Sequence, residues 1–262
     1  PFSRSSRNTF MAFGTPLPHA PTSYLASLKR DLQREKDQKR LEADRAFWEH
    51  TLDLGEPIYT DIAGSRRLRE AQMETHNPRL RAAFQETEKI DVGQYSYYLE
   101  PEPAARLQEF CRGQGISMDS LLMMAIRTYL SKVNGGMTDI TVRHYLSRRA
   151  SALNRFCGGV RIHMYPCRTV LGAQTGFLEG SRAIQQMQAR IYRHADFDPL
   201  LLRKMMAKRF RHGENMTYEG VALTYQPLPL RLKNERISGL PYKVRWLTNG
   251  SEAQPLYLTV MH

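Results

Sequence analysis

Residues 139–170 read DITVRHYLSRRASALNRFCGGVRIHMYPCRTV, and this stretch decides the fold class. Residues 140–146 and residues 160–167 each alternate in character with a period of two, which is typical of half-buried strands. The loop between the two strands is basic and contains Arg148, Arg149 and Arg155. Because these arginines lie where strands end, we expect them to face a cleft.

Helical patterns surround this pair of strands. We expect helices over residues 23–52, 103–113, 118–133 and 176–192, and from residue 200 into the basic run at 208–213. We expect further strands over residues 93–100, 221–226, 242–248 and 255–261. Residues 53–90 read as a connector without a dominant element. Helices that follow strands in this way predict an α/β protein, with a mixed sheet packed by helices.

The predicted helix over residues 23–52 is polar in its middle, where residues 31–40 read DLQREKDQKR. Opposite charges three and four positions apart support a helix only weakly. Leucines near its start and the aromatic pair Phe47 and Trp48 near its end provide apolar anchors. We therefore expect one long helix that crosses the surface and docks at both ends.

The chain is basic, with a formal net charge of +12 over 262 residues. A hydrophobic content of 41% and a charged content of 24% fit a globular protein. Positive charge suggests an acidic partner, either nucleic acid or an acidic carrier protein or domain. The basic residues are spread over several segments and do not alternate with aromatic residues, so the sequence does not favour nucleic acid.

The three cysteines, Cys111, Cys157 and Cys167, are widely spaced. Such spacing argues against a disulfide framework and against a zinc site, so we expect reduced thiols and a cytoplasmic protein. The sequence contains no apolar run long enough to span a bilayer and no signal peptide. The first residue is Pro1, not methionine, and we expect a longer natural chain.

Familiar catalytic motifs are missing from the sequence, which has no phosphate-binding glycine loop, no HExxH and no GxSxG. The histidines are dispersed without partners at metal-ligand spacing, so we expect no metal. A structural role is favoured over a catalytic one for His163, on a strand, and for His194, after a helix. Arg149 is the strongest candidate for a cleft-lining charge, paired with Asp139; a solvated loop arginine is the alternative.

Four ordered segments resemble the condensation domains of nonribosomal peptide synthetases, which belong to a chloramphenicol acetyltransferase-like superfamily. Residues 21–52 are similar to the family's crossover segment, and residues 115–142 to the helix and strand that open its C-terminal lobe. LTYQPL at 223–228 and WLTNGSEAQPLYLTV at 246–260 resemble later strands of that lobe. The single residues that match the family's pattern are Asp139, Arg149, Gly159, Pro166, Arg168, His194 and Pro199.

The sequence departs from the family's pattern in three places. The HHxxxDG motif, whose second histidine is the family's usual candidate base, has no counterpart here and by the family's order falls upstream of Pro1. Residues 143–145 read Arg-His-Tyr where the family has Gly-x-Pro, and Arg161 and His163 stand where it has Phe and Asn. We therefore expect an unusual tunnel lining and no catalytic residue within this chain.

The resemblance implies a fold and a division of the chain. The fold is the C-terminal half of a chloramphenicol acetyltransferase-like pseudodimer. Residues 1–90 would be a crossover and linker segment with the long charged helix, and residues 91–262 a C-terminal lobe that is incomplete at both ends.

The resemblance also implies an activity, the formation of an amide bond between a donor acyl or peptidyl thioester and an acceptor aminoacyl thioester. Both substrates would ride on the phosphopantetheine arms of carrier proteins, with no cofactor bound directly. The implied partners are carrier proteins, adjacent synthetase domains and the N-terminal lobe of the same domain, without nucleic acid or membrane.

The residues expected to line the substrate tunnel are Arg149, Arg161, His163, Tyr225 and Gln226. The alternative is a non-catalytic, condensation-like scaffold that docks carrier proteins or partner enzymes. Nucleic-acid binding is a third possibility, which only the net charge supports.

Overall fold

The computed structural model describes residues 23–85, 92–149, 151–155, 157–226 and 254–261. The helices are α2 (Tyr24–Arg34), α3 (Gln38–Leu52), α4 (Arg66–Glu74), α5 (Pro101–Gln114), α6 (Met118–Val133), α7 (Ala152–Arg155), α8 (Phe177–Arg193) and α9 (Pro199–Phe210). The strands are β1 (Ala83–Phe84), β2 (Asp139–Ser147), β3 (Ile162–Val170), β4 (Met216–Thr217), β5 (Val221–Gln226) and β6 (Leu256–Met261).

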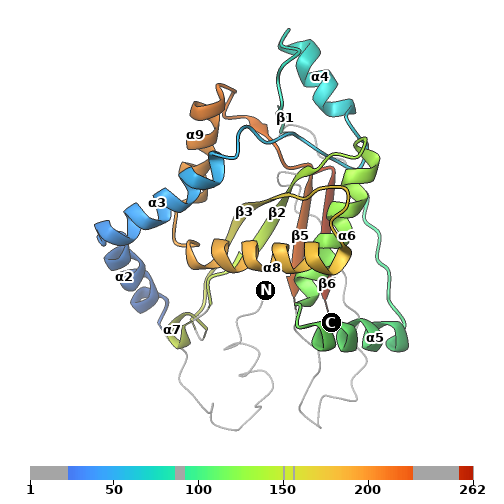
Figure 1. Cartoon of the computed structure of the whole chain (residues 1–262). Coiled ribbons are helices and arrows are strands. Elements are labelled where there is room, and N and C mark those ends of the chain that lie inside the picture. Colours follow the sequence, from blue (N-terminus) through green and yellow to red (C-terminus); the bar gives the residue numbers. More distant parts are fainter. Residues whose placement is uncertain (1–22, 86–91, 150, 156, 227–253, 262) are drawn as a thin grey trace.

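The main sheet of the described part has four strands in the order β3-β2-β5-β6 (Figure 1). β2 and β3 are antiparallel and pair along their whole length, from Asp139 opposite Val170 to Ser147 opposite Ile162. β5 is parallel to β2, and β6 is parallel to β5. This mixed sheet, packed by helices, confirms the predicted α/β class.

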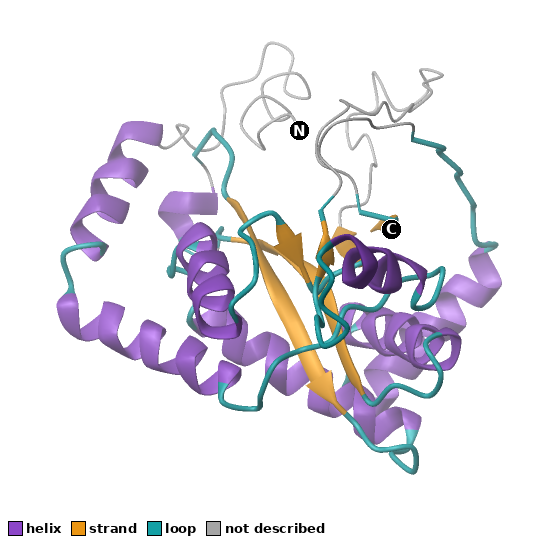
Figure 2. Ribbon diagram, turned by 90° about the horizontal axis from the view of Figure 1, so that it is seen from above, coloured by secondary structure: helices purple, strands orange, loops and turns teal. Residues whose placement is uncertain are grey.

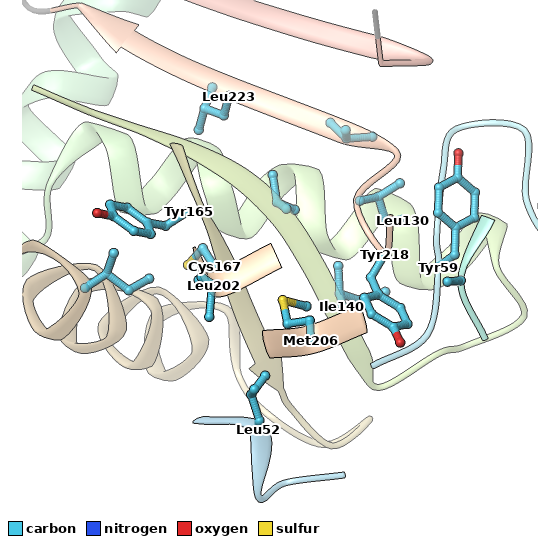
Figure 3. Close-up of a cluster of buried hydrophobic side chains, with 14 of the residues drawn as sticks. Leu52, Tyr59, Leu130, Ile140, Tyr165, Cys167, Leu202, Met206, Tyr218 and Leu223 are labelled. Atoms are coloured by element: carbon cyan, nitrogen blue, oxygen red, sulfur yellow. The ribbon is translucent and has the colours of Figure 1, made fainter. Parts of the chain in front are cut away.

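Helices α6 and α8 pack on each other and on one face of the sheet. Figure 2 shows the strands in the middle, with helices along one side and at the flanks. The core between sheet and helices contains large buried side chains from distant segments, several of which Figure 3 draws. Trp48, Tyr165, Tyr218, Met123 and Leu223 are among the largest buried side chains. Residues before 85 and after 118 therefore share one hydrophobic core.

The two faces of β3 differ in solvent exposure, although both carry apolar side chains. Tyr165 and Cys167 are buried on the side of the helices, whereas Ile162 and Met164 are 51% and 41% exposed on the opposite face. The Tyr165 hydroxyl donates hydrogen bonds to backbone carbonyls of Ala195 and Phe197, which satisfy its polar end inside the core.

The prediction of one helix over residues 23–52 is wrong, because the chain forms two helices. α2 ends at Arg34, and α3 begins at Gln38 after a turn. Asp37 is the N-cap of α3, and its side chain accepts a hydrogen bond from the backbone amide of Arg40. A short acidic cap starts a new helix where the charge pattern alone predicts continuation. The expected docking at the far end is confirmed, because Trp48 is buried.

Two other expectations also need correction. Residues 92–100 form no strand, and Tyr95, Tyr97 and Tyr98 are largely exposed there. Alternation alone does not make a strand, because a strand also needs a neighbour for its backbone. The supposed connector over residues 53–90 contains α4 and β1, which pairs with β4.

The remaining elements agree with the sequence. Ser117 caps α6 by accepting a hydrogen bond from the amide of Ser120, and Asp198 caps α9 in the same way through the amide of Leu200. Helices α5 and α8 and strands β5 and β6 lie where they were expected. The predicted strand over residues 242–248 lies outside the described residues. Among those described, no helix combines the length and the apolar character that a membrane span needs.

Candidate functional site

Arg149 organises the loop that follows β2. Its guanidinium donates hydrogen bonds to the backbone carbonyl oxygens of Asn154 at 2.8 Å, Cys157 at 2.7 Å and Gly159 at 2.6 Å. These bonds close the loop between β2 and β3. Arg149 therefore holds backbone in place, and neither the solvated alternative nor a pairing with Asp139 describes these contacts.

Asp139 instead forms a bidentate ion pair with Arg168 on the neighbouring strand. Arg168 Nη2 lies 2.6 Å from one carboxylate oxygen of Asp139, and Arg168 Nε lies 2.9 Å from the other. Such bidentate pairs are among the stronger charge-assisted contacts in proteins. The expected partnership of Asp139 with Arg149 is therefore wrong, since antiparallel pairing brings Arg168 beside it.

The side chain of Arg161 points towards α2. Its Nη2 atom lies 3.0 Å and 2.7 Å from the two carboxylate oxygens of Asp31. Both side chains are mostly buried. Arg161 thereby fixes a helix that precedes it by 130 residues in sequence.

Asp196, between α8 and α9, forms ion pairs with three arginines from three segments. Its carboxylate lies 3.2 Å from Arg34 of α2, 2.6 Å from Arg40 of α3 and 2.7 Å from Arg148 after β2. Burial alone would raise the pKa of Asp196, but the hydrogen bond from Arg148 and the nearby positive charges outweigh it and lower that pKa below its usual value. The result is a charge cluster that ties α2 and α3 to the sheet.

His163 lies in the same cluster, with both ring nitrogens engaged. Nδ1 lies 3.1 Å from the carbonyl oxygen of Ala195 and 3.0 Å from the hydroxyl of Tyr165, and Nε2 lies 3.3 Å from Arg148 Nη1. Burial, followed by the charge of Arg148, lowers the pKa of His163. A proton on Nδ1 satisfies Ala195 and leaves Nε2 to accept from Arg148, so the lone pair of this histidine is already occupied.

A cavity of about 200 Å³ opens within this cluster. Its walls are Asp31, Arg34, Glu35, Arg40, Leu41, Asp44, Arg148, His163, Asp196 and Asp198. Several buried polar atoms here, among them Arg40 Nε and Asp44 Oδ2, have no hydrogen-bond partner within the described residues. Charges of both signs line the cavity, which suits water or another small polar molecule.

Tyr225 and Gln226 lie in another place, at the carboxyl end of β5. Tyr225 lines a cavity of about 550 Å³, together with Cys111 of α5, Ser117 and Met118 at the start of α6, and Gln185 of α8. Burial raises the pKa of Tyr225. Gln226 is the next residue and lies opposite Met261 of β6. The five predicted tunnel residues therefore do not form one cluster, because Arg161 and His163 are near a different cavity.

Two histidine–carboxylate pairs were not anticipated from the sequence. His144 Nε2 lies 2.8 Å from Asp119 Oδ2, and His194 Nδ1 lies 2.7 Å from Asp44 Oδ1. The ring of His194 stacks on Phe47 at a centroid distance of 4.3 Å, which supports the structural role predicted for it. The partners are 25 and 150 residues apart in sequence, so no local motif marks them.

The reactive side chains in the described part of the chain are mostly engaged or shielded. Burial raises the pKa of Cys167 to about 12 and also raises that of Cys111, which keeps both thiols protonated at neutral pH. No three His, Cys, Asp or Glu side chains converge on a metal-sized site among the described residues. Within these residues, ion pairs and cavity walls can position a bound molecule.

A protein-family comparison identifies residues 9–236 as a match to the condensation-domain family. The chain belongs to the condensation-domain family. The match spans most of the chain, and the mixed sheet packed by helices is the fold that this family shares with chloramphenicol acetyltransferase-like proteins.

Individual relatives agree with this assignment. One of the plipastatin synthase subunits of Bacillus subtilis (strain 168) is 24% identical over 214 residues, which cover 81% of this chain and 8% of that protein. The structure of VibH, an NRPS condensation enzyme, matches with a TM-score of 0.67 and 13% identity. The first condensation domain of the CDA synthetase matches with a TM-score of 0.63 and 17% identity.

The matched region is about half of these solved structures. The VibH match covers 97% of this chain and 53% of VibH, and the CDA synthetase match covers 87% of this chain and 46% of that domain. At these identities the structures establish the fold.

Arg143 illustrates how this member departs from the family's pattern. Its side chain forms a buried ion pair with Glu219, at a position where the resemblance implies a glycine. Beside it, the ring of Tyr145 stacks on Tyr257 of β6 at 5.1 Å. Burial, reinforced by Tyr257, raises the pKa of Tyr145 to about 12, so its phenol stays neutral.

Proposed function

We propose that this chain is the C-terminal lobe and crossover segment of a condensation domain that forms amide bonds in nonribosomal peptide synthesis. The amine of an aminoacyl group on one carrier protein attacks the thioester of an acyl or peptidyl group on another. The family match over residues 9–236 is the observation that carries the proposal. The proposal includes the boundary between the crossover segment, residues 1–90, and the C-terminal lobe, residues 91–262.

The chain's share of the reaction is positioning. Both substrates arrive on phosphopantetheine arms, and holding two such arms in line removes a large entropic barrier to their reaction. Arg149 would support this role by fixing the loop after β2, and Tyr225, at the end of β5, would supply part of a cavity wall, with Gln226 next to it in the strand. The proposed base is the second histidine of an HHxxxDG motif in the other half of the domain.

The proposed partners are peptidyl carrier proteins and neighbouring synthetase domains, in the cytoplasm. A net charge of +12 would attract acidic carrier proteins and speed their encounter with this lobe. The three cysteines are free and buried, which agrees with a reducing compartment.

The test is amide formation between two loaded carrier proteins by the complete domain. We expect product from the intact domain and a large loss when the second histidine of HHxxxDG is changed to alanine. A complete domain with that motif intact that binds both carriers and yields no amide would contradict the proposal.

A second candidate is a scaffold that docks carrier proteins without catalysis. It is favoured by the charged pairs at positions where the family has small or neutral residues, Arg143 with Glu219 and Arg161 with Asp31. Replacing Arg143 with glycine in the complete domain separates the two: a gain of amide formation in R143G would favour the scaffold function for the natural protein. Unchanged carrier binding in R143G would show that the fold survives the change.

A further inference from the structure

Helix α2 is oriented opposite to an ordinary surface helix. An amphipathic helix normally places its apolar side on the core and its polar side in water. In α2, Ser27 is fully buried, while Leu25, Leu28 and Leu32 are 65%, 39% and 49% exposed. The polar side of α2 therefore lies on the protein, and the leucine side lies outward.

Three polar contacts set this orientation. Ser27 Oγ donates a hydrogen bond of 2.8 Å to Oδ1 of the buried Asn154, Asp31 accepts from Arg161, and Arg34 donates to Asp196. Residues 27, 31 and 34 recur at spacings of four and three, which places them on one side of the helix. Hydrogen bonds and ion pairs on this side therefore hold α2 against the rest of the protein.

The leucines follow the same rule on the other side. Positions 25, 28 and 32 recur at spacings of three and four, about a third of a turn around the helix from the anchors. Tyr24 lies at the end of this stripe, against the backbone of Gly159. Gly159 has a φ of 82°, which favours glycine, and a Cβ atom there would lie 2.6 Å from the Tyr24 ring.

We propose that the stripe Leu25, Leu28 and Leu32 is the surface on which the other half of the condensation domain packs. This inference rests on the proposed function. Its first support is the apolar stripe itself, which is turned outward by satisfied polar anchors. Its second support is the length of the solved relatives: this chain covers 53% of VibH and 46% of the CDA synthetase domain, so about half of each domain remains to be placed against it.

The experiment compares the labelling of single cysteines in this chain and in the complete domain encoded by the same reading frame. Leu25→Cys and Leu32→Cys report on the stripe, and Met73→Cys on α4 is the matched control, because Met73 is 68% exposed. The three native cysteines are buried and free, so they add little background to maleimide labelling. Carrier-to-carrier amide formation is measured on the same preparations.

We expect both α2 cysteines to react quickly in this chain and at least about tenfold more slowly in the complete domain, since labelling there must await local opening. The Met73 control should react equally in both. Equal rates for Leu25→Cys and Leu32→Cys in the two proteins would overturn the inference, even if amide formation is intact. Protection without amide formation would support the interface and contradict the proposed function.

Other occupants give different results. Labelling of this chain that slows as its own concentration rises would identify a second copy as the occupant. Protection that appears only when an acidic carrier protein is added would identify the carrier. Either result, or a reading frame that supplies no second half, overturns the proposal.

Discussion

Helices α2 and α3 are neighbours in sequence and attach to the same lobe by opposite means. α3 buries Trp48, which stacks on Tyr165 at 5.0 Å and belongs to the main hydrophobic core. α2 attaches through Ser27, Asp31 and Arg34, with its leucines outward. The difference teaches that a surface helix can be attached mainly through its polar side, with its leucines left exposed.

The hydrophobic attachment of α3 should be the costlier one to break. Trp48→Ala removes a large side chain that is 1% exposed, and we expect a loss of about 3–5 kcal/mol in the free energy of unfolding. Chemical denaturation followed by circular dichroism measures it. Leu54→Ala, at a position that is 61% exposed, is the control and should change stability by less than about 0.5 kcal/mol. A small effect at Trp48 would mean that α3 is not anchored by this contact.

Breaking an ion pair of α2 should cause the next largest loss of stability. Arg161→Met preserves most of the side-chain volume but leaves the mostly buried carboxylate of Asp31 with the more distant Arg148, at 3.8 Å. We expect a loss of about 3 kcal/mol, with faster amide hydrogen exchange in α2 than in α3. The double variant R161M/D31N removes this weakly paired charge and should recover much of that loss. A double variant as unstable as R161M would show that the effect is not electrostatic.

The Asp196 cluster allows the same comparison to be made with pH. The pKa of Asp196 is lowered in the folded state, so its contribution is complete above the unfolded value of about 3.9 and is lost as the pH falls through the folded value. We expect Asp196→Asn to cost about 2 kcal/mol at pH 7 and progressively less below about pH 4. The negative charge of Asp196 also favours the protonated form of His163, so the comparison is made in a His163→Gln background. A difference that stays constant from pH 7 to pH 3 would contradict this account.

Sequence reasoning recovered the elements whose signals are local. Ser117 and Asp198 are cap residues of a type that marks the start of a helix, and the alternation around residues 140–146 marks β2. It failed where the decisive partner is distant. Arg34 and Asp196 are 162 residues apart, and no pattern near either residue announces their contact.

The misreading of residues 23–52 has the same cause. Leucines at helical spacing look like core anchors, because periodicity reports which residues share a face but not which face is inward. Only the contacts of Asp31 and Ser27 reveal that the polar side faces the protein. Among the predicted tunnel residues, Arg161 and His163 are two positions apart and so share one side of the strand, but no local pattern shows that α2 lies over that side.

The smallest expected effect is on the leucine stripe, and it tests the comparison most directly. Leu32→Ser changes a side chain that is 49% exposed on the outward side of α2, so in this chain we expect a stability change of less than about 0.5 kcal/mol. Leu52→Ala, at a buried leucine of α3, is the matched case and should cost about 2–5 kcal/mol. Equal losses at the two leucines would mean that Leu32 is packed within this lobe, and α2 would then be attached by the same force as α3.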